Sequence, residues 1–433
     1  MFHHRLPHAI RGHARDAVSN TRIAVLHHAR SFFPLDLFER TRQTADLIWV
    51  LDDAFSADTV TRRLLKRLGM VVDIAGLDDD AAAETIALAS PDGILSFVDD
   101  QIPRAAALAR RLGLRYHTPE LAHVLTDKGA QRAVLGTAGV PQPWFVSVPA
   151  RSSRDELTVV ARQLDFPCVV KPASGMASRG IRLIHSPQEF VTLAGSESDH
   201  VVEEYLRDSD DLPPWAGSYL SVETVVVGGR SRHIALTGRF PVAAPFRETG
   251  NFIPAIADAT TRSRVIALAD AVVSALSVRD SLLHIEIKLT PSGPRLIEVN
   301  GRLGGRPGFV LSEVSKVNLF AVACKVAAGL PVDLEEVTPV DGVGFWFMFQ
   351  PPMSAASLVA AEGVEEASRL NGVRQLDQKR FSGQPVDWRE GTDGQVLTVH
   401  GAVANHDNLG RLITRLQGDI RLTYADTIEI LEG

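Results

Sequence analysis

The segment 282–305 limits the possible folds more than any other part of the chain. Two runs in which apolar and polar residues alternate flank a Pro-Ser-Gly sequence at 291–293, which predicts a β-hairpin with a three-residue loop. Counting back from this loop predicts three opposed pairs: Lys288 with Leu296, Glu286 with Glu298, and His284 with Asn300. Directly opposite residues point to the same face with Cβ atoms about 5 Å apart. The two glutamates are therefore expected to converge on one face of a sheet.

The converging carboxylates predict a metal site. Like charges this close repel unless a positive charge lies between them, and Mg²⁺ takes one or two carboxylates together with substrate phosphates. Asn300 can add an amide oxygen on the same face. The alternative is a solvated pair of glutamates balanced by Lys288 and Arg302. We favour the metal because the opposite face of the hairpin is apolar and covers a core, formed by Ile285, Ile287, Leu289, Ile297 and Val299.

A second segment, 166–184, predicts a loop that a phosphate could approach. A strand delivers Lys171 into a run of glycines and serines, after which the chain resumes as a strand. Gly175 and Gly180 have P-loop spacing, but Ile and Arg follow where Lys and Ser/Thr are required, which excludes a P-loop NTPase. Small residues let backbone N–H groups approach an anion, and Lys171 supplies a point charge. Taken alone, the loop also fits a plain turn.

The charge balance requires any anion to be met by local cations. The formal net charge is −7, which offers no general attraction to nucleic acid or to an anionic membrane surface. Only seven of the 45 basic residues are lysine, so a lysine next to a glycine-rich loop stands out.

The order of elements predicts a mixed α/β protein of several domains. Apolar runs at 22–27, 46–51, 70–74 and 93–97, with amphipathic stretches at 59–68 and 102–112, predict a parallel sheet with helices on both faces. No G-x-G-x-x-G follows the first strand, which argues against a dinucleotide site. Further on, 312–329 is predicted to be helical and 332–343 a linker. The expected domains are a polar arm (1–20), a Rossmann-like domain (21–125), a nucleotide- and metal-binding domain (126–335) and a small α+β domain (336–433).

Cysteine usage and hydropathy predict a cytoplasmic protein. Cys168 and Cys324 lie in apolar runs and cannot form a disulfide framework. No apolar stretch reaches the roughly 18 residues that span a bilayer, and the start of the chain lacks a secretory signal. The histidines near the amino end show no regular ligand spacing, so that arm is expected to be solvated and metal-free.

Five motifs, in order and spacing, resemble the ATP-grasp superfamily and, within it, the carboxylate–amine ligases of the L-amino acid ligase type. They are Thr126-Asp-Lys-Gly-Ala-Gln-Arg132, Val169-Val-Lys-Pro172 with its Ser/Gly loop, Val202-Glu-Glu-Tyr-Leu206, Ser221-Val-Glu-Thr224, and Glu286 with Glu298-Val-Asn-Gly-Arg302. The similarity covers about 121–308. It implies an ATP-grasp fold preceded by the Rossmann-like domain and followed by the small α+β domain.

The resemblance also implies roles for single residues. ATP would be bound by Lys128, Lys171 and Ser178, and by the hinge Glu203, Glu204, Tyr205 and Leu206, whose backbone pairs with adenine. Mg²⁺, with Mn²⁺ as a substitute, would be held by Glu286, Glu298 and Asn300. The catalytic set would be Arg302, Lys171 and Glu223, and the substrates would be bound by Glu223, Glu248, Arg302 and Arg306. For Glu223, a salt-bridged strand glutamate is the alternative to a ligand of the substrate's ammonium group.

One departure from the family concerns the acid substrate. Relatives often carry an aspartate after the Gly-Gly pair, whereas this chain has Arg306-Pro307-Gly308. A second guanidinium besides Arg302 favours bidentate binding of a carboxylate. The acid substrate is therefore expected to carry an extra carboxylate or another anionic group.

The implied reaction joins two small molecules. A carboxylic acid, expected to be an amino acid, would attack the γ-phosphate of ATP, and an amine would capture the acyl phosphate, releasing ADP and phosphate. A carboxylase of the biotin carboxylase or aminoimidazole ribonucleotide carboxylase kind, which phosphorylates bicarbonate, is the first alternative. A non-catalytic nucleotide-binding regulator is the second. Relatives are often dimers, so a homodimer is compatible with the resemblance.

Overall fold

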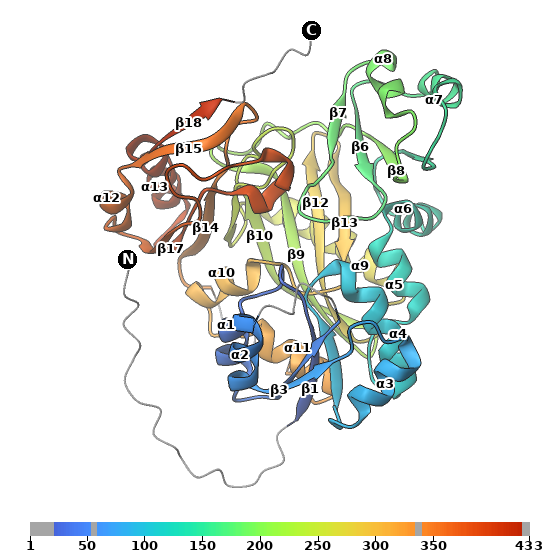
Figure 1. The fold of residues 1–433 in the computed structure, drawn as a ribbon. Coiled ribbons are helices and arrows are strands. Elements are labelled where there is room, and N and C mark those ends of the chain that lie inside the picture. The colour runs from blue at the N-terminus through green and yellow to red at the C-terminus, as the bar shows by residue number, and fades with distance from the viewer. Residues whose placement is uncertain (1–20, 53–58, 334–339, 427–433) are drawn as a thin grey trace.

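The computed structural model describes residues 21–52, 59–333 and 340–426 (Figure 1). The predicted histidine-rich arm and half of the predicted linker lie outside these residues. Among the described residues, no helix is both long and apolar enough to cross a membrane.

The N-terminal region is a parallel four-stranded sheet in the order β3-β2-β1-β4. Its strands are β1 (Arg22–His27), β2 (Asp46–Leu51), β3 (Met70–Asp73) and β4 (Gly93–Ser96), and its helices are α1 (Pro34–Thr41), α2 (Thr59–Leu68), α3 (Asp79–Ala87), α4 (Ile102–Leu112) and α5 (Pro119–Thr126). Alternate residues of one strand pack on opposite faces: Ile23 and Val25 lie in the core with α1 and α2, and Ala24 and Leu26 in the core with α3 and α4. The predicted sheet with helices on both faces is confirmed.

A small antiparallel sheet in the order β5-β8-β6-β7 follows. Its elements are α6 (Lys128–Thr137), β5 (Phe145–Val148), α7 (Arg154–Ala161), β6 (Cys168–Pro172), β7 (Arg182–Ile184), α8 (Pro187–Phe190) and β8 (His200–Glu204). Helix α6 begins where the Asp127 side chain accepts from the backbone N–H of Ala130 at 2.7 Å, which places Lys128 in its first turn.

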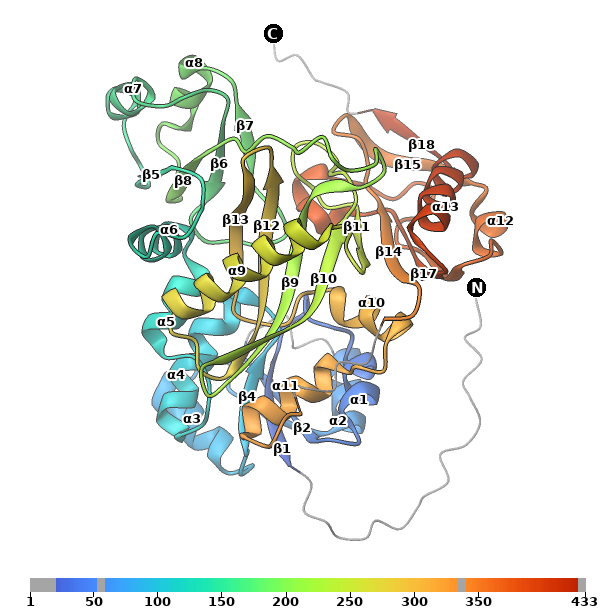
Figure 2. The same cartoon turned by 180° about the vertical axis from the view of Figure 1, so that it is seen from behind.

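The largest sheet has eight strands in the order β13-β12-β9-β10-β11-β14-β17-β16. Its strands are β9 (Gly217–Val227), β10 (Arg230–Arg239), β11 (Gly250–Ile253), β12 (Ser281–Thr290), β13 (Gly293–Asn300), β14 (Val343–Phe349), β16 (Val373–Gln378) and β17 (Leu397–Val403). Helix α9 (Ala259–Ala275) covers one face of this sheet (Figure 2), where Val265, Leu268 and Val272 pack against strand residues. The opposite face carries polar residues near the hairpin, such as His284 and Glu286, whereas Val225, Ala235 and Leu282 on the same sheet join the core with α10 and α11.

The remaining elements close the fold around this sheet. They are α10 (Pro307–Val314), α11 (Leu319–Ala328), β15 (Ala355–Glu362), α12 (Val364–Ser368), a 3-10 helical segment (Trp388–Gly394), α13 (His406–Asp419) and β18 (Arg421–Asp426). Strands β14, β17 and β16 continue the large sheet, so one sheet extends across the predicted domain boundary at 335. Helix α11 packs back onto β1 and β4 of the N-terminal sheet.

Two predictions about these elements are wrong. The predicted single helix over 312–329 is interrupted, because Asn318 caps α11 by accepting from the backbone N–H groups of Phe320 and Ala321. In the predicted hairpin, Thr290 pairs with Gly293, so the loop has two residues rather than three.

The wrong loop length does not change the pairing at the predicted metal site. A bulge between Glu286 and Ile287 shifts the register by one residue, so Glu286 still pairs with Glu298 and His284 with Asn300, as predicted. Closer to the turn Lys288 pairs with Arg295 instead of Leu296. As a result Leu296 is buried in the core and Ile297, predicted on the apolar face, lines the cavity described below.

Candidate active site

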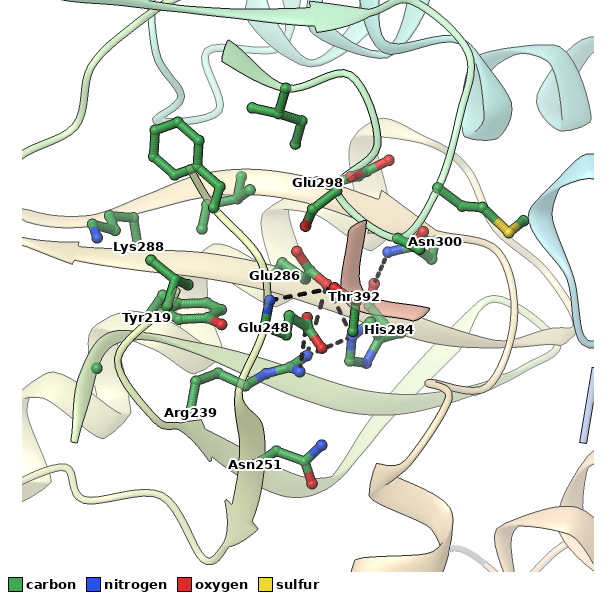
Figure 3. A pocket seen from close by; sticks show the side chains of 18 of the residues that line it. Tyr219, Arg239, Glu248, Asn251, His284, Glu286, Lys288, Glu298, Asn300 and Thr392 are labelled. Atoms are coloured by element: carbon green, nitrogen blue, oxygen red, sulfur yellow. Dashed lines mark hydrogen bonds and ion pairs between the residues drawn. The ribbon is translucent and has the colours of Figure 1, made fainter. Parts of the chain in front are cut away.

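A cavity of about 770 Å³ opens between the small sheet, the polar face of the large sheet and the N-terminal region (Figure 3). The residues predicted for the site that line it are Lys128, Lys171, Ser178, Glu203, Glu204, Tyr205, Leu206, Glu248, Glu286, Glu298, Asn300, Arg302 and Arg306. Glu223 does not line it. The cavity therefore brings together predicted residues from Lys128 to Arg306, which lie far apart in the sequence.

The small sheet contributes a buried ion cluster around Glu203. The Oε2 atom of Glu203 lies 2.7 Å from Lys171 Nζ, and its Oε1 atom accepts from Arg132 Nε at 3.0 Å. Burial alone would raise the pKa of Glu203, but the two cations outweigh it and lower the pKa to about 2. The cluster holds Lys171 at the cavity wall. The Glu203 side chain is occupied with these cations and not directed at a ligand.

Lys128 bridges the glycine-rich loop and the predicted metal carboxylates. Its Nζ donates to the Gly175 carbonyl oxygen at 3.0 Å and lies 3.0 Å from Glu298 Oε1. Burial disfavours the ammonium form, yet Glu298 raises the pKa of Lys128 above its ordinary value. Lys128 thus remains a cation at the point where loop and carboxylates meet.

The loop after Lys171 has an unusual backbone. Ala177 and Ser178 both have φ near +57°, which side-chain-bearing residues rarely adopt, and Gly175 and Gly180 have φ of +148° and +68°. A loop of this shape turns back over the cavity instead of continuing the strand. Ser178 lies in this loop and is one of the residues that line the cavity.

The predicted hinge, residues 203–206, begins within strand β8. Glu203 and Glu204 pair within β8, and the Glu204 backbone N–H donates to Trp144 O at 3.1 Å. The backbones of Tyr205 and Leu206 follow the strand, and among the described residues no hydrogen bond occupies them. If a nucleobase pairs with the hinge backbone, Tyr205 and Leu206 are the residues with free groups.

The two facing glutamates are each paired with a cation in this structure. Glu298 meets Lys128, and Glu286 Oε1 lies 3.2 Å from His284 Nε2 and 3.7 Å from Arg239 Nη2. Burial would raise the pKa of Glu286, but His284 and Arg239 lower it. Glu286 is therefore an ionised acceptor near neutral pH.

The donor set fits Mg²⁺. Glu286, Glu298 and Asn300 offer carboxylate and amide oxygens, the donors this ion prefers, with room left for phosphate oxygens. Asn300 Oδ1 has only a 3.5 Å contact with Arg302 Nη2. In the described parts of the chain, no group of three or more His, Cys, Asp or Glu side chains is suited to a metal, so a zinc-type centre is absent there.

Behind the cavity wall, Glu223 supports His284. The imidazole Nδ1 lies 2.9 and 3.0 Å from the two oxygens of Glu223, which also accepts from Ser221 Oγ at 2.9 Å and Thr237 Oγ1 at 3.2 Å. Burial opposes a charged imidazole, but Glu223 outweighs it and raises the pKa of His284 to about 9. Glu223 is 2% exposed, so the structure puts it in contact with His284 and out of reach of a ligand.

Sequence reasoning missed Arg239 and Asp99. Arg239, 2% exposed, pairs with Glu248 at 3.0 Å and lies over the Tyr219 ring, 5.7 Å from its centroid. Asp99 forms an ion pair with Arg302. A signal existed for Asp99, which follows β4 at the carboxyl end of a parallel strand, where ligands commonly bind. No local signal marks Arg239, which ends an ordinary strand.

Arg306 differs from every other cation of the cavity. Among the described residues that line it, Arg306 is the one Lys or Arg with no carboxylate within ion-pair distance. Its guanidinium stacks on Trp346, 4.6 Å from the ring centroid. Burial lowers the pKa of Arg306. Because the ordinary pKa of a guanidinium is very high, the side chain nevertheless stays charged.

Residues 126–306 match the family model described as the ATP-grasp domain. Among curated relatives, the chain is 26% identical over 325 residues to carnosine synthase 1 of Homo sapiens, covering 69% of this chain and 38% of that protein. It is 22% identical over 402 residues to the L-arginine-specific L-amino acid ligase of Bacillus subtilis, covering 88% and 92%. The chain spans less than two thirds of several curated relatives that it matches.

Solved structures extend the fold similarity to nearly the whole chain. The L-amino acid ligase of Bacillus licheniformis matches with a TM-score of 0.72 at 17% identity, covering 94% of this chain and 99% of that one. A carboxyaminoimidazole ribonucleotide synthase of Aspergillus clavatus reaches the same TM-score at 14% identity, covering 92% of this chain and 98% of that one. The fold is thus shared by amide-forming and carboxylating enzymes and does not separate them.

Proposed function

We propose that the protein is an ATP- and Mg²⁺-dependent ligase that joins a small carboxylic acid to an amine. The observation that carries this is one cavity holding Lys128 and Lys171 at a glycine-rich loop, the opposed Glu286 and Glu298, and the guanidinium of Arg302. The similarity to an L-amino acid ligase over most of both chains supports amide formation over carboxylation.

The cavity residues suit transfer of the γ-phosphate to a carboxylate. Phosphoryl transfer needs positioned cations on the migrating charge and little covalent help. Lys128 and Lys171 would bind phosphate oxygens, and the backbone of Tyr205 and Leu206 would pair with adenine. Mg²⁺ would be held by Glu286, Glu298 and Asn300 and would supply charge compensation for the triphosphate.

Acyl transfer would follow in the same cavity. Phosphorylation turns the carboxylate oxygen into a phosphate leaving group, and the amine nitrogen then attacks the acyl carbon with release of phosphate. Arg302, fixed by Asp99, would stabilise the developing oxyanion through its N–H donors. Glu248, 25% exposed and fixed by Arg239, would bind the ammonium group of a substrate.

Arg306 supports an acid substrate with a second anionic group. Arg306 has no carboxylate partner among the residues that the structure describes and keeps its charge at all ordinary pH values, so this charge is left for a ligand. Its stacking on Trp346 fixes the plane of the guanidinium, which favours bidentate recognition of a carboxylate. A dicarboxylic or otherwise anionic amino acid is the proposed donor class.

The test is phosphate release from ATP and Mg²⁺ by the purified protein. Pairs of amino acids that include aspartate or glutamate as the acid are compared with bicarbonate plus amines, and products are identified by mass spectrometry. Amide products support the ligase. Carboxylated products, or nucleotide binding without phosphate release across the whole panel, would instead support the carboxylase or the regulator.

A further inference from the structure

The segment Trp388–Gly394 lies far along the chain from the ATP-grasp domain but reaches its cavity. Thr392 and Asp393 line the cavity, and Figure 3 shows Thr392 beside Glu248 and Glu286. No function was predicted for the C-terminal region that carries them. Their contacts connect the loop after Lys171 with the segment around Glu248, which belong to different elements of the fold.

The first set of contacts is with the loop after Lys171. The Thr392 backbone N–H donates to the Ala177 carbonyl oxygen at 2.8 Å. Arg179 donates through Nη2 to Asp393 Oδ2 at 2.6 Å and through Nε to the Glu390 carbonyl oxygen at 3.1 Å. Three hydrogen bonds, one of them an ion pair, therefore attach this loop to the C-terminal region.

The second set of contacts is with Glu248. The Glu248 backbone N–H donates to Thr392 Oγ1 at 3.3 Å. Gln350 Nε2 donates to the carbonyl oxygens of both Glu248 and Thr392, at 2.8 and 3.1 Å. One residue, Thr392, thus contacts the loop through its backbone and the Glu248 segment through its side chain.

Both Ala177 in the loop and Gly391 in the C-terminal segment have a positive φ, which side-chain-bearing residues rarely adopt. Ala177 has φ of +57° without being glycine, so the contact compensates for an unfavourable conformation. Gly391 has φ of +68°, and a Cβ there would lie 2.0 Å from the Ala177 carbonyl oxygen. Only glycine lets the segment approach the loop this closely.

We infer that the segment Trp388–Gly394 is a positioning element of the active site, which holds the glycine-rich loop in place over the cavity and fixes it relative to Glu248. Through Thr392, ordering of the loop by a nucleotide is coupled to ordering of the Glu248 segment. The inference has two halves. The holding half, that the segment keeps the loop in place, requires no ligand. The coupling half, that a nucleotide orders the loop and the Glu248 segment together, rests on the proposed function.

Trypsin tests the holding half without any nucleotide, because the bond after Arg179 lies in the loop. Gly391→Ala and Asp393→Asn are expected to increase cleavage there about tenfold over the wild type, measured by mass spectrometry against cleavage at other arginines of the same chain. Gly383→Ala is the matched glycine control, since Gly383 has φ of +83° and no atom lies within 4 Å of the added Cβ. Glu390→Gln is the matched charge control, since its carboxylate bonds Arg380 and not the loop.

The outcomes are distinct. Faster cleavage in Gly391→Ala and Asp393→Asn with wild-type rates in both controls supports the inference. Wild-type rates in all four variants, or equal acceleration in the controls, would overturn it.

Calorimetric titration with AMP-PNP and Mg²⁺ tests the coupling half. Gly391→Ala is expected to raise the Kd about fivefold, while Gly383→Ala leaves it unchanged. An unchanged Kd in Gly391→Ala overturns the coupling. No binding by the wild type overturns the proposed function itself, and the trypsin result still decides whether the segment holds the loop.

Discussion

Glu203→Gln should destabilise the protein strongly, although the substitution removes only one charge. The carboxylate is 3% exposed and lies between Lys171 at 2.7 Å and Arg132 at 3.0 Å, whose side chains are 10% and 2% exposed. The amide would leave two buried cations without an anion. Uncompensated buried charge is among the few mechanisms by which a single substitution costs several kcal/mol.

The magnitude follows from the pKa of Glu203. The environment lowers this pKa from the ordinary 4.5 to about 2, despite burial, which acts in the opposite direction. Because one pKa unit corresponds to about 1.4 kcal/mol, the ionised form is favoured by about 3 kcal/mol relative to an exposed carboxyl. A loss of about 3 kcal/mol from the free energy of unfolding is therefore expected, in line with the roughly 3–5 kcal/mol found when one partner of a buried ion pair is removed.

The assay is urea denaturation at pH 7, followed by circular dichroism and tryptophan fluorescence. Glu204→Gln is the matched control, because the neighbouring carboxylate pairs with Arg295 at 2.9 Å in a site that is 32% exposed, where a loss below about 1 kcal/mol is expected. Since the folded-state pKa of Glu203 lies below the unfolded value, its contribution is present above pH 4.5 and is lost as the pH falls from 4.5 towards 2. The difference between wild type and Glu203→Gln should narrow over that interval. Equal stability of the two glutamine variants at pH 7, or a difference that does not change with pH, would refute the reasoning.

Three further substitutions test the site. Glu298→Gln should reduce phosphate release at least about 100-fold with an unchanged circular dichroism spectrum, because it removes a proposed metal ligand; full activity would remove the metal assignment. Glu223→Gln should lower kcat about 10- to 100-fold and leave the KM for ATP near the wild-type value, since Glu223 acts through His284 on Glu286; a raised KM for the amine with unchanged kcat would favour direct substrate binding instead. Arg306→Ala should raise the KM for the acid substrate while ATP affinity stays constant, and an unchanged KM would contradict the proposed second anionic group.

The sequence predicted the elements more reliably than their neighbours in space. Apolar runs predicted β1 and β2 at their observed bounds, and alternation in the hairpin opposed Glu286 to Glu298 even though loop length and bulge were both missed. Those two errors compensate because each changes the register by one residue. The alternation of apolar and polar residues in the hairpin does not indicate where a bulge falls.

The role expected for Glu223 shows the same limit. Its position on a strand was predictable, but the strand pairing that puts His284 directly opposite it joins residues 61 positions apart. The imidazole, not a ligand, therefore occupies the space in front of the carboxylate. Arg239 and Thr392 were missed for the same reason, since each reaches the cavity from an element with no motif of its own.

The pairing of charges in the cavity is compatible with the proposed binding of a triphosphate by a protein of net negative charge. Lys171 is balanced by Glu203, which is buried and fixed, whereas Lys128 is balanced by Glu298, which is 24% exposed and faces the cavity. Phosphate oxygens would therefore be able to draw Lys128 away from its carboxylate, and Glu298 would then be free to bind a cation. In the proposed mechanism, the same glutamate would neutralise the lysine before ATP binds and would become a metal ligand afterwards, so a substitution of Lys128 would also affect the proposed metal site. Arg306 would take no part in this exchange, because among the described residues no carboxylate lies within ion-pair distance of it, and its charge would be left for the proposed acid substrate.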